Sequence, residues 1–408
     1  MKRSTIGLLG LIAISAAVAF GGISGANAGF SRNKVTLLVV TDLSSVNEAM
    51  SGPGTVEAVK MAIEDFGGNI NGVPINLLVV DTKNDVAIAS SKTEELIKTE
   101  GVDAIFDVPN SAAAIAVVDI AKRYKVTTVI VTSATTAITN EHCNKYSWHY
   151  SLDTYALSKV AATKITQLGA KKWYTITADY AFGHSFYDNY KKNIEAVGGK
   201  IIGNDMVPFP NEDFSTYLLK AKAANPDAIA FLNSGPDTVN AMKQAGEFGL
   251  RDGKIRIVPA LVYISDVDAL GADAWAGSTI AVPWYWNMDA QARAWSDRFQ
   301  KRAGNRPTSL KAANYSAATQ ILKTMQRLNT DDADAIAQAL EDRPFEDFFI
   351  RHGKWRKYDH RVLHDMYLAE IKAAKDVKEP QDYFKIIATV PGEQAFMPLS
   401  ESTCKHDW

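Results

Sequence analysis

Cysteine is nearly absent from this sequence: Cys143 and Cys404 are the only two in 408 residues. Two thiols allow one disulfide at most, and they have no partners at the spacing of a zinc site. Histidine is also sparse, and the seven histidines contain no His-Glu-x-x-His pair. His360 and His364 are four residues apart, but no carboxylate with a clear role as a third ligand stands beside them. We therefore expect neither a metal nor a cofactor.

Nucleotide-binding and catalytic motifs are missing as well. There is no G-x-x-x-x-G-K-[ST] loop for a nucleoside triphosphate and no G-x-S-x-G turn for a serine hydrolase. Gly52 and Gly54 precede a helix, but the third glycine of a dinucleotide fingerprint is absent and Pro53 stands between them. The loops are rich in hydroxyl and carboxylate residues, yet no base is evidently paired with a nucleophile. We therefore expect no catalytic residues and no enzyme.

The sequence also lacks an excess of basic charge and a second long apolar run. The formal net charge of −2 argues against a nucleic-acid partner. The one long apolar run, Ile6–Phe20, follows two basic residues and precedes small residues at 26–28. This order predicts a cleavable signal peptide at residues 1–28 and an exported, soluble protein. In an exported chain two cysteines can pair, so we predict a Cys143–Cys404 disulfide, with two unpaired thiols as the alternative.

Strand and helix patterns alternate along the rest of the chain, in two successive series. Near-continuous apolar strands separated by amphipathic helices are typical of a parallel sheet covered on both faces. We therefore predict an α/β protein with two doubly wound, Rossmann-like lobes. The expected strands are Lys34–Val40, Ile75–Asp81, Asp103–Val108 and Thr127–Val131, then Lys171–Thr177, Lys200–Val207, Asp227–Asn233 and Ile255–Ala260. The expected helices are Gly54–Phe66, Val86–Lys98, Ser111–Tyr124, Ser185–Val197, Phe214–Ala223, Thr238–Gly249, Ala290–Arg302 and Ala312–Arg327.

We expect the chain to cross between the lobes more than once. Residues 148–159 are the natural first crossing, and we expect the last helices to complete the first lobe before the apolar segment Asp365–Ile371 crosses again. These crossings assign residues 33–151 and 285–365 to lobe I, residues 152–284 and 366–395 to lobe II, and residues 396–408 to a C-terminal tail. The predicted disulfide ties this tail to the first lobe.

Ligands of doubly wound sheets bind outside the carboxyl ends of the strands, where loops lead into helices. In this chain the rule selects the loops 43–54, 108–111, 132–136, 179–183 and 233–237, together with the loop after Ala260.

Four segments carry a resemblance to a known family. They are "PNSAAAIAV" (109–117), "VIVTSATTAITN" (129–140), "ADYAFGHS" (178–185) and "FSTYLLKAKAANPDAIAF" (214–231). In this order, behind a signal peptide, they resemble the periplasmic substrate-binding proteins of the leucine/isoleucine/valine-binding family, which serve branched-chain amino acid-type ABC transporters. The resemblance covers essentially the whole mature chain. It implies a monomeric type I periplasmic binding protein whose three-segment hinge closes the lobes around a small molecule and whose partner is a membrane permease.

Members of this family clamp the ligand carboxylate with a serine hydroxyl and backbone N–H groups of the first lobe. The resemblance assigns that role here to Ser111 with its neighbour Asn110, to the backbone of Ala134 and to Thr136. N–H donors at a helix start stabilise an anion without a full positive charge nearby. Ser111 could instead be a plain N-cap of its helix, and Thr136 a loop hydroxyl that faces water. The convergence of two loops favours the clamp.

One departure from the family concerns the second lobe. Amino-acid binders of the family have an acidic residue just after the proline of the strand that ends here in "RIVPALVYISD", and this acid pairs with the ligand ammonium. Here Ala260 and Leu261 follow Pro259. An unpaired ammonium in a closed cleft is strongly disfavoured, so we expect an organic acid that is not an α-amino acid. Acids that could replace the missing one are Asp179, Asp237 and Asp266.

Apolar and aromatic residues in the selected loops predict an apolar or flat ligand. The candidate wall residues are Met50, Tyr155, Tyr180, Phe182, Ser234, Leu261 and Tyr263. The alternative for each aromatic is a place in the core between the lobes. The sequence thus predicts a periplasmic solute-binding protein of an ABC importer that captures a small apolar or aromatic carboxylate. A branched-chain amino acid-binding protein and a ligand-sensing receptor subunit on the same fold stay open as alternatives.

Overall fold

The computed structural model describes Met1 and residues 29–408. The signal peptide predicted at residues 1–28 therefore lies, apart from Met1, outside the described residues. Within the described part of the chain, no helix has the length and apolar character needed to cross a membrane.

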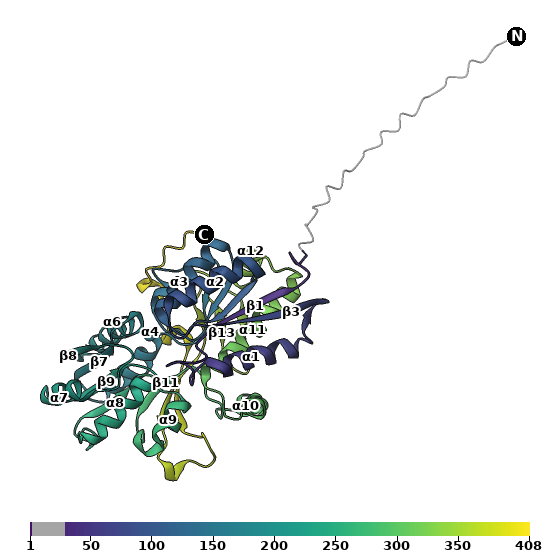
Figure 1. The fold of residues 1–408 in the computed structure, drawn as a ribbon. Helices are drawn as coiled ribbons and strands as arrows, with labels where there is room; N and C mark the ends of the chain where they lie inside the picture. The colour runs from purple at the N-terminus through teal and green to yellow at the C-terminus, as the bar shows by residue number, and fades with distance from the viewer. Residues whose placement is uncertain (2–28) are drawn as a thin grey trace.

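The first lobe is built around a six-stranded sheet (Figure 1). All its neighbouring strands are parallel except the short β2, which forms a hairpin with β3. In sheet order the strands are β2 (Asn69–Ile70), β3 (Val73–Asp81), β1 (Val35–Thr41), β4 (Ala104–Asp107), β5 (Thr127–Ile130) and β6 (Ser147–His149). The four strands predicted for the first series are confirmed as β1, β3, β4 and β5.

Helices cover both faces of this sheet because the buried strands are apolar on both faces. Leu37 and Val39 of β1 pack into one core cluster with α1 (Gly52–Asp65) and α11 (Ser309–Leu328). Leu38 and Val40 pack into another cluster with α2 (Val86–Glu100) and α3 (Ser111–Tyr124). The late helix α11 therefore completes the first lobe, as the order of elements predicted.

The second lobe is built around a four-stranded parallel sheet. In sheet order its strands are β10 (Arg256–Pro259), β9 (Ala228–Leu232), β7 (Lys172–Ala178) and β8 (Lys200–Val207). Its helices include α6 (Ala181–Glu195), α7 (Ser215–Ala223), α8 (Pro236–Glu247) and α9 (Ile264–Leu270). All four strands predicted for this lobe are confirmed, because continuous apolar runs such as β9 signal buried strands by themselves.

Three connections join the two lobes. The first runs from β6 through α4 (Thr154–Leu157), the π-helical turn 158–162 and α5 (Thr163–Gln167), and the second leads from β11 (Thr279–Val282) to α10 (Ala290–Ala303). The third leads into β15 (Met366–Ile371), which pairs antiparallel with β11 and with β16 (Phe384–Val390). We retain the lobe boundaries 33–151 with 285–365, and 152–284 with 366–395, as proposals.

The connections touch one another at a buried polar cluster. Arg361 and His364 both bond to the carbonyl oxygen of Ser151 in the first connection. His149 forms an isolated parallel bridge with Arg361. This cluster holds the third connection against the first. The remaining elements of the first lobe are α12 (Ala333–Leu340) and a small sheet of β12 (Pro344–Phe345), β13 (Gly353–Trp355) and β14 (Val362–Leu363).

The C-terminal tail is tied to the first lobe, as predicted. The Cys143–Cys404 disulfide is present, with the two sulfurs 2.04 Å apart. Beside it, the Thr403 amide donates to the Asn140 side chain at 2.9 Å. The tail also reaches the second lobe, because Glu401 lies 2.6 Å from Lys192 of α6. Residues 396–408 therefore bridge the two lobes.

Candidate ligand-binding site

The turn between β4 and α3 carries Asn110 and Ser111, the first half of the predicted clamp. The Asn110 side chain accepts hydrogen bonds from the amides of Ala112 and Ala113, at 2.9 and 3.1 Å, so Asn110 is the N-cap of α3. The idea that Ser111 caps this helix is therefore wrong: Ser111 is its first helical residue. Its hydroxyl oxygen lies 3.0 Å from that of Ser133 and is free of any capping role.

The backbone just before this turn is strained. Asp107 and Val108 have φ angles of +82° and +59°, a region that is costly for a carboxylate side chain and more so for a β-branched one. Asp107 is wholly buried and accepts hydrogen bonds from Thr132 and from Asn314 of α11. These contacts hold the turn in its strained conformation, and they place Ser111 at the carboxyl edge of the sheet.

The loop after β5 carries the other half of the clamp. The carbonyl oxygen of Ala134 accepts a hydrogen bond from the Thr154 amide at 2.8 Å. Both the amide and the hydroxyl of Thr136 lie 3.2 Å from the Ser185 hydroxyl of α6, in the second lobe. The resemblance assigns the amide and the hydroxyl of Thr136 to the ligand carboxylate. In this structure both groups are instead bonded to Ser185, across the lobe boundary. Ser111, Ser133 and Ala134 remain together on the first-lobe side.

Three of the predicted wall residues and the predicted clamp residue Ala134 belong to one buried apolar cluster that draws on both lobes. Met50 and Ala134 come from the first lobe, and Phe182 and Leu261 come from the second. Their exposed fractions lie between 3% and 6%. Tyr180 packs against the same cluster. The cluster also contains Tyr263 and Leu310, and Leu310 is a residue that the sequence did not indicate.

Tyr180 lies on a second-lobe surface made of aromatic rings and hydroxyls. Its ring stacks on Phe209 with the ring centres 4.6 Å apart, a partner that the sequence did not indicate. Burial raises the pKa of Tyr180, and a hydrogen bond with Ser234 opposes that rise. Ser234 therefore lies beside Tyr180.

Tyr155 is placed differently from the other predicted wall residues. Burial raises its pKa, and the carboxylate of Glu401, to which it is hydrogen-bonded, raises it further. The ammonium of Lys192 lies 6.0 Å from the centre of its ring. Both neighbours belong to the contact between the C-terminal tail and α6. Tyr155 is thus engaged with the tail.

The place of the missing family acid is apolar and buried. Ala260 and Leu261 are 2% and 4% exposed. Asp266 does not replace the acid, because its carboxylate accepts a hydrogen bond from the Tyr263 amide at 2.8 Å within the cap of α9. Asp179 is bonded to the exposed His184 at 2.7 Å. Of the three alternative acids, Asp237 alone retains a buried carboxylate oxygen with no protein partner.

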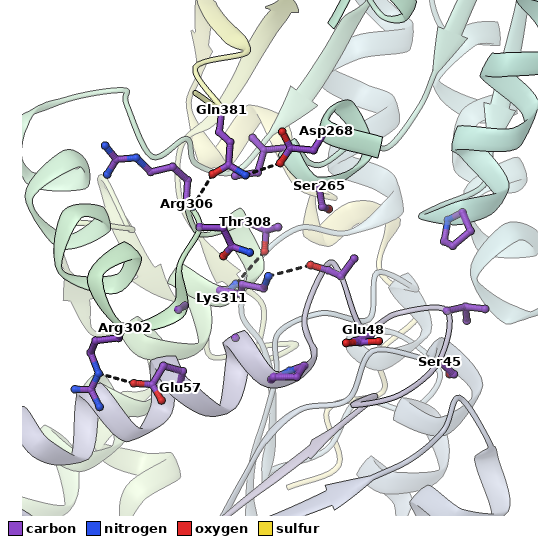
Figure 2. A pocket seen from close by; sticks show the side chains of 18 residues that line it. Ser45, Glu48, Glu57, Ser265, Asp268, Arg302, Arg306, Thr308, Lys311 and Gln381 are labelled. Carbon is purple, nitrogen blue, oxygen red and sulfur yellow. Dashed lines mark hydrogen bonds and ion pairs between the residues drawn. The ribbon is translucent and has the colours of Figure 1, made fainter. Parts of the chain in front are cut away.

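A cavity of about 650 Å³ opens beside this region, between the loop after β1, the α10–α11 connection and α9 (Figure 2). Lys311 of α11 is buried in its wall and donates to the Ala49 carbonyl oxygen at 2.9 Å. Burial lowers the pKa of Lys311 to about 8. On the opposite side, Gln381 donates to Asp268 of the second lobe. None of the predicted site residues lines the cavity, but residues of two of the selected loops, 43–54 and 233–237, do.

The described residues 29–408 hold no group of three or more His, Cys, Asp or Glu side chains placed to bind a metal ion.

Comparisons with known proteins identify the family. Residues 34–376 match the family model described as periplasmic binding protein. A periplasmic binding protein from Burkholderia mallei is 37% identical, with a TM-score of 0.90, over 92% of this chain and all of that one. A branched chain amino acid ABC transporter periplasmic ligand-binding protein from Burkholderia xenovorans is 36% identical over the same shares, with a TM-score of 0.83.

More distant relatives agree with this assignment. Leu/Ile/Val-binding protein homolog 6 of Brucella melitensis is 26% identical over 55% of this chain, and the match spans only 58% of that relative's length. Two solute binding proteins from Rhodopseudomonas palustris, solved with benzoate and with 4-hydroxybenzoate, are 18% and 22% identical, with TM-scores of 0.79 and 0.80. They match 91% and 88% of this chain and 99% and 97% of their own, and at that identity they show the fold alone. The chain belongs to the periplasmic binding protein family, is related to the Leu/Ile/Val-binding protein homologues, and has the type I periplasmic binding fold.

Proposed function

We propose that this protein is a periplasmic solute-binding protein of an ABC importer that captures a small apolar or aromatic carboxylate between its lobes and delivers it to a membrane permease. One observation carries the choice of ligand. The position from which amino-acid binders of the resembled family pair the ligand ammonium holds Ala260 and Leu261, and both are buried. Burying an ammonium beside two apolar side chains without a partner costs several kcal/mol, roughly, before any contact is gained.

The first-lobe side of the site suits the carboxylate end of such a ligand. Ser111 lies in the first turn of α3, where the helix dipole favours an anion, although the Asn110 side chain already accepts from the amides of Ala112 and Ala113. Its hydroxyl and that of Ser133 are neighbours, and a hydroxyl can donate to a carboxylate. No full positive charge is needed for this kind of anion site.

The second-lobe side suits an apolar body. Phe182 and Leu261 lie in the apolar cluster with Met50 of the first lobe, and the stacked pair of Tyr180 and Phe209 adds flat surface. Ligand sites of this type have apolar walls with a few polar anchors. The benzoate and 4-hydroxybenzoate complexes of R. palustris proteins with this fold support an aromatic acid as the first choice of ligand.

A thermal-shift screen followed by calorimetric titration tests the proposal. We expect benzoate or a related aromatic acid to raise the melting temperature, since a ligand at a hundredfold its Kd stabilises by roughly 2.7 kcal/mol. Leucine and valine are the matched amino acids, and we expect no shift with either. A shift with leucine or valine and none with carboxylates that lack an amine overturns the proposed ligand class.

A branched-chain amino acid is the second candidate ligand. It is favoured by the buried carboxylates of Asp107 and Asp237, because each retains one oxygen without a protein partner that an ammonium could meet. The name of the B. xenovorans relative also points that way. An ammonium-bearing ligand requires one of these two carboxylates as its partner. The same thermal-shift screen separates the two candidates, because it compares leucine and valine with carboxylates that lack an amine.

A further inference from the structure

The segment 233–237, between β9 and α8, contains buried polar atoms that the protein leaves without partners. The Asn233 side chain is fully buried, and neither its carboxamide nitrogen nor its oxygen has a hydrogen-bond partner. Asp237 is 1% exposed, and one of its carboxylate oxygens, Oδ2, is likewise unpartnered. Buried side-chain polar groups are normally hydrogen-bonded, and an unpaired one costs about 1–3 kcal/mol. Three such atoms in five residues call for an explanation.

The fold places this segment at the boundary between the lobes. Asn233 directly follows β9, so it lies at the carboxyl edge of the second-lobe sheet, where ligands of such sheets bind. A side chain added at Gly235 would come within 3.4 Å of the Val46 carbonyl oxygen of the first lobe. Pro236 lines the cavity between the lobes. The unpaired atoms therefore belong to the part of the second lobe that meets the first.

Neighbouring polar groups show that the fold can satisfy such atoms. Ser234, between the two residues, has a hydrogen bond with Tyr180. The other oxygen of Asp237 accepts a hydrogen bond from the Asn211 amide at 3.1 Å. Asp266, which is also buried, lies in the first turn of α9 and accepts one from the Tyr263 amide. Against this background the free carboxamide of Asn233 and the free oxygen of Asp237 are exceptions.

We propose that Asn233 and Asp237 bind a second polar group of the ligand, at the end opposite the carboxylate held by the Ser111 side. This inference rests on the proposed function. A carboxamide offers a donor and an acceptor, and a carboxylate oxygen accepts, so the set matches a hydroxyl group, which both donates and accepts. The ligand is then an aromatic acid that carries a hydroxyl group, and not an unsubstituted acid such as benzoate.

Calorimetric titration of the full-length mature chain with benzoate, 4-hydroxybenzoate and 3,4-dihydroxybenzoate tests this inference. We expect the wild-type protein to bind at least one of the hydroxylated acids tenfold or more tightly than benzoate, because a site built around unpaired polar atoms rejects a ligand that leaves them unpaired. Asn233→Leu keeps the side-chain size and removes the unpaired atoms. We expect it to abolish the preference for hydroxylated acids over benzoate, and we expect Asp237→Asn to reduce that preference.

Thr166→Val is the matched control. Thr166 of α5 is fully buried, and its hydroxyl is also unpaired. It packs against Gly199, the residue before β8, so it lies far from the carboxyl edge of the sheet. We expect this variant to keep the wild-type preference. Equal wild-type affinity for all three acids, or an equal loss for all three in Asn233→Leu, overturns the inference and leaves the proposed function standing. Failure of all three acids to bind contradicts the proposed aromatic ligand, and with it this inference.

Discussion

The hydroxyl oxygens of Ser111 and Ser133 lie 3.0 Å apart, where the start of α3 meets the loop after β5. Two hydroxyls in contact use only one of their two protons for each other, so the second proton is available to an acceptor. The amides of Ala112 and Ala113 are bonded to Asn110, and the dipole of α3 adds a partial positive charge at this end of the helix. The pair is therefore a preformed donor site for an anion, and it is separate from the cap that Asn110 makes.

Ser111→Ala is expected to weaken carboxylate binding at least tenfold and to leave the fold intact. The variant removes a hydroxyl donor without touching the cap of α3, so the loss appears in the Kd measured by calorimetry and not in the denaturation midpoint. Asn110→Ala is the matched variant. It removes the cap and is expected to lower the free energy of unfolding by about 1 kcal/mol. A Ser111→Ala protein with unchanged Kd would remove this residue from the clamp.

Ser185→Ala is expected to weaken ligand binding about fivefold without removing any ligand contact. The Ser185 hydroxyl lies 3.2 Å from the Thr136 hydroxyl and 2.7 Å from that of Thr154, so it joins α6 to the first lobe. Loss of a hydrogen bond worth about 1 kcal/mol shifts the lobes away from the closed arrangement, and the apparent affinity falls by the same factor. Ser90→Ala, at a half-buried position on α2 in the first lobe, is the control. Equal Kd values for both variants would contradict the role of this contact in closure.

Replacing both cysteines by serine is expected to lower the free energy of unfolding by about 2–5 kcal/mol. The Cys143–Cys404 bridge closes a loop with a sequence separation of 261 residues, so its loss greatly increases the freedom of the unfolded chain. Urea denaturation of the double variant against the oxidised wild type measures the change. Reduced wild-type protein should match the double variant. Agreement between the oxidised and reduced wild-type curves would show that the bridge adds no stability.

Asp237→Asn is expected to stabilise the ligand-free protein at pH 8 and to have no effect at pH 4. Burial raises the pKa of Asp237 from 3.8 to about 7. The folded protein therefore keeps this proton between pH 4 and 7 while the unfolded chain loses it, and the stability contributed by the group falls as the pH rises through 7. An asparagine never carries the buried charge, and it still accepts from Asn211.

Asp213→Asn is the control for this pH dependence. Asp213 is exposed, and hydrogen bonds from the hydroxyl and amide of Ser215 lower its pKa. We expect the control substitution to destabilise the protein slightly at pH 8, the opposite sign to Asp237→Asn. Urea midpoints at pH 4 and pH 8 measure both. A stabilisation by Asp237→Asn that is equal at the two pH values would show that charge burial is not its cause.

Several elements could be predicted because their signals are local. The helix Ser111–Tyr124 has the predicted bounds, since a polar cap and an apolar stripe at helical spacing mark it. The strands β11 and β16 escaped prediction. β11 pairs with β15, which lies more than eighty residues further along the chain, so that pairing depends on tertiary contact and not on a nearby turn. β16 pairs with β15 after the short connection 372–383.

The order of elements explains where some of the predicted site residues lie, and tertiary contacts explain the others. Met50, Ala134, Phe182 and Leu261 meet in one cluster because the carboxyl ends of parallel strands share an edge, a rule that needs only the order of elements. Tyr155 lies against the tail because Glu401 and the nearby disulfide hold residues 396–408 there. No local pattern reveals such a contact, since nearly 250 residues separate its partners.

By itself, the sequence determined the two series of buried strands, the family and the pairing of its only two cysteines, since each follows from residue type and order along the chain. Only the tertiary structure decided which hydrogen-bond partner each polar group of the site has. It assigned the cap of α3 to Asn110 and left the Ser111 hydroxyl free for another partner. It also left Asn233 and one oxygen of Asp237 without partners. Hydrogen bonding depends on distances of a few tenths of an ångström, which only the packing of the two lobes sets.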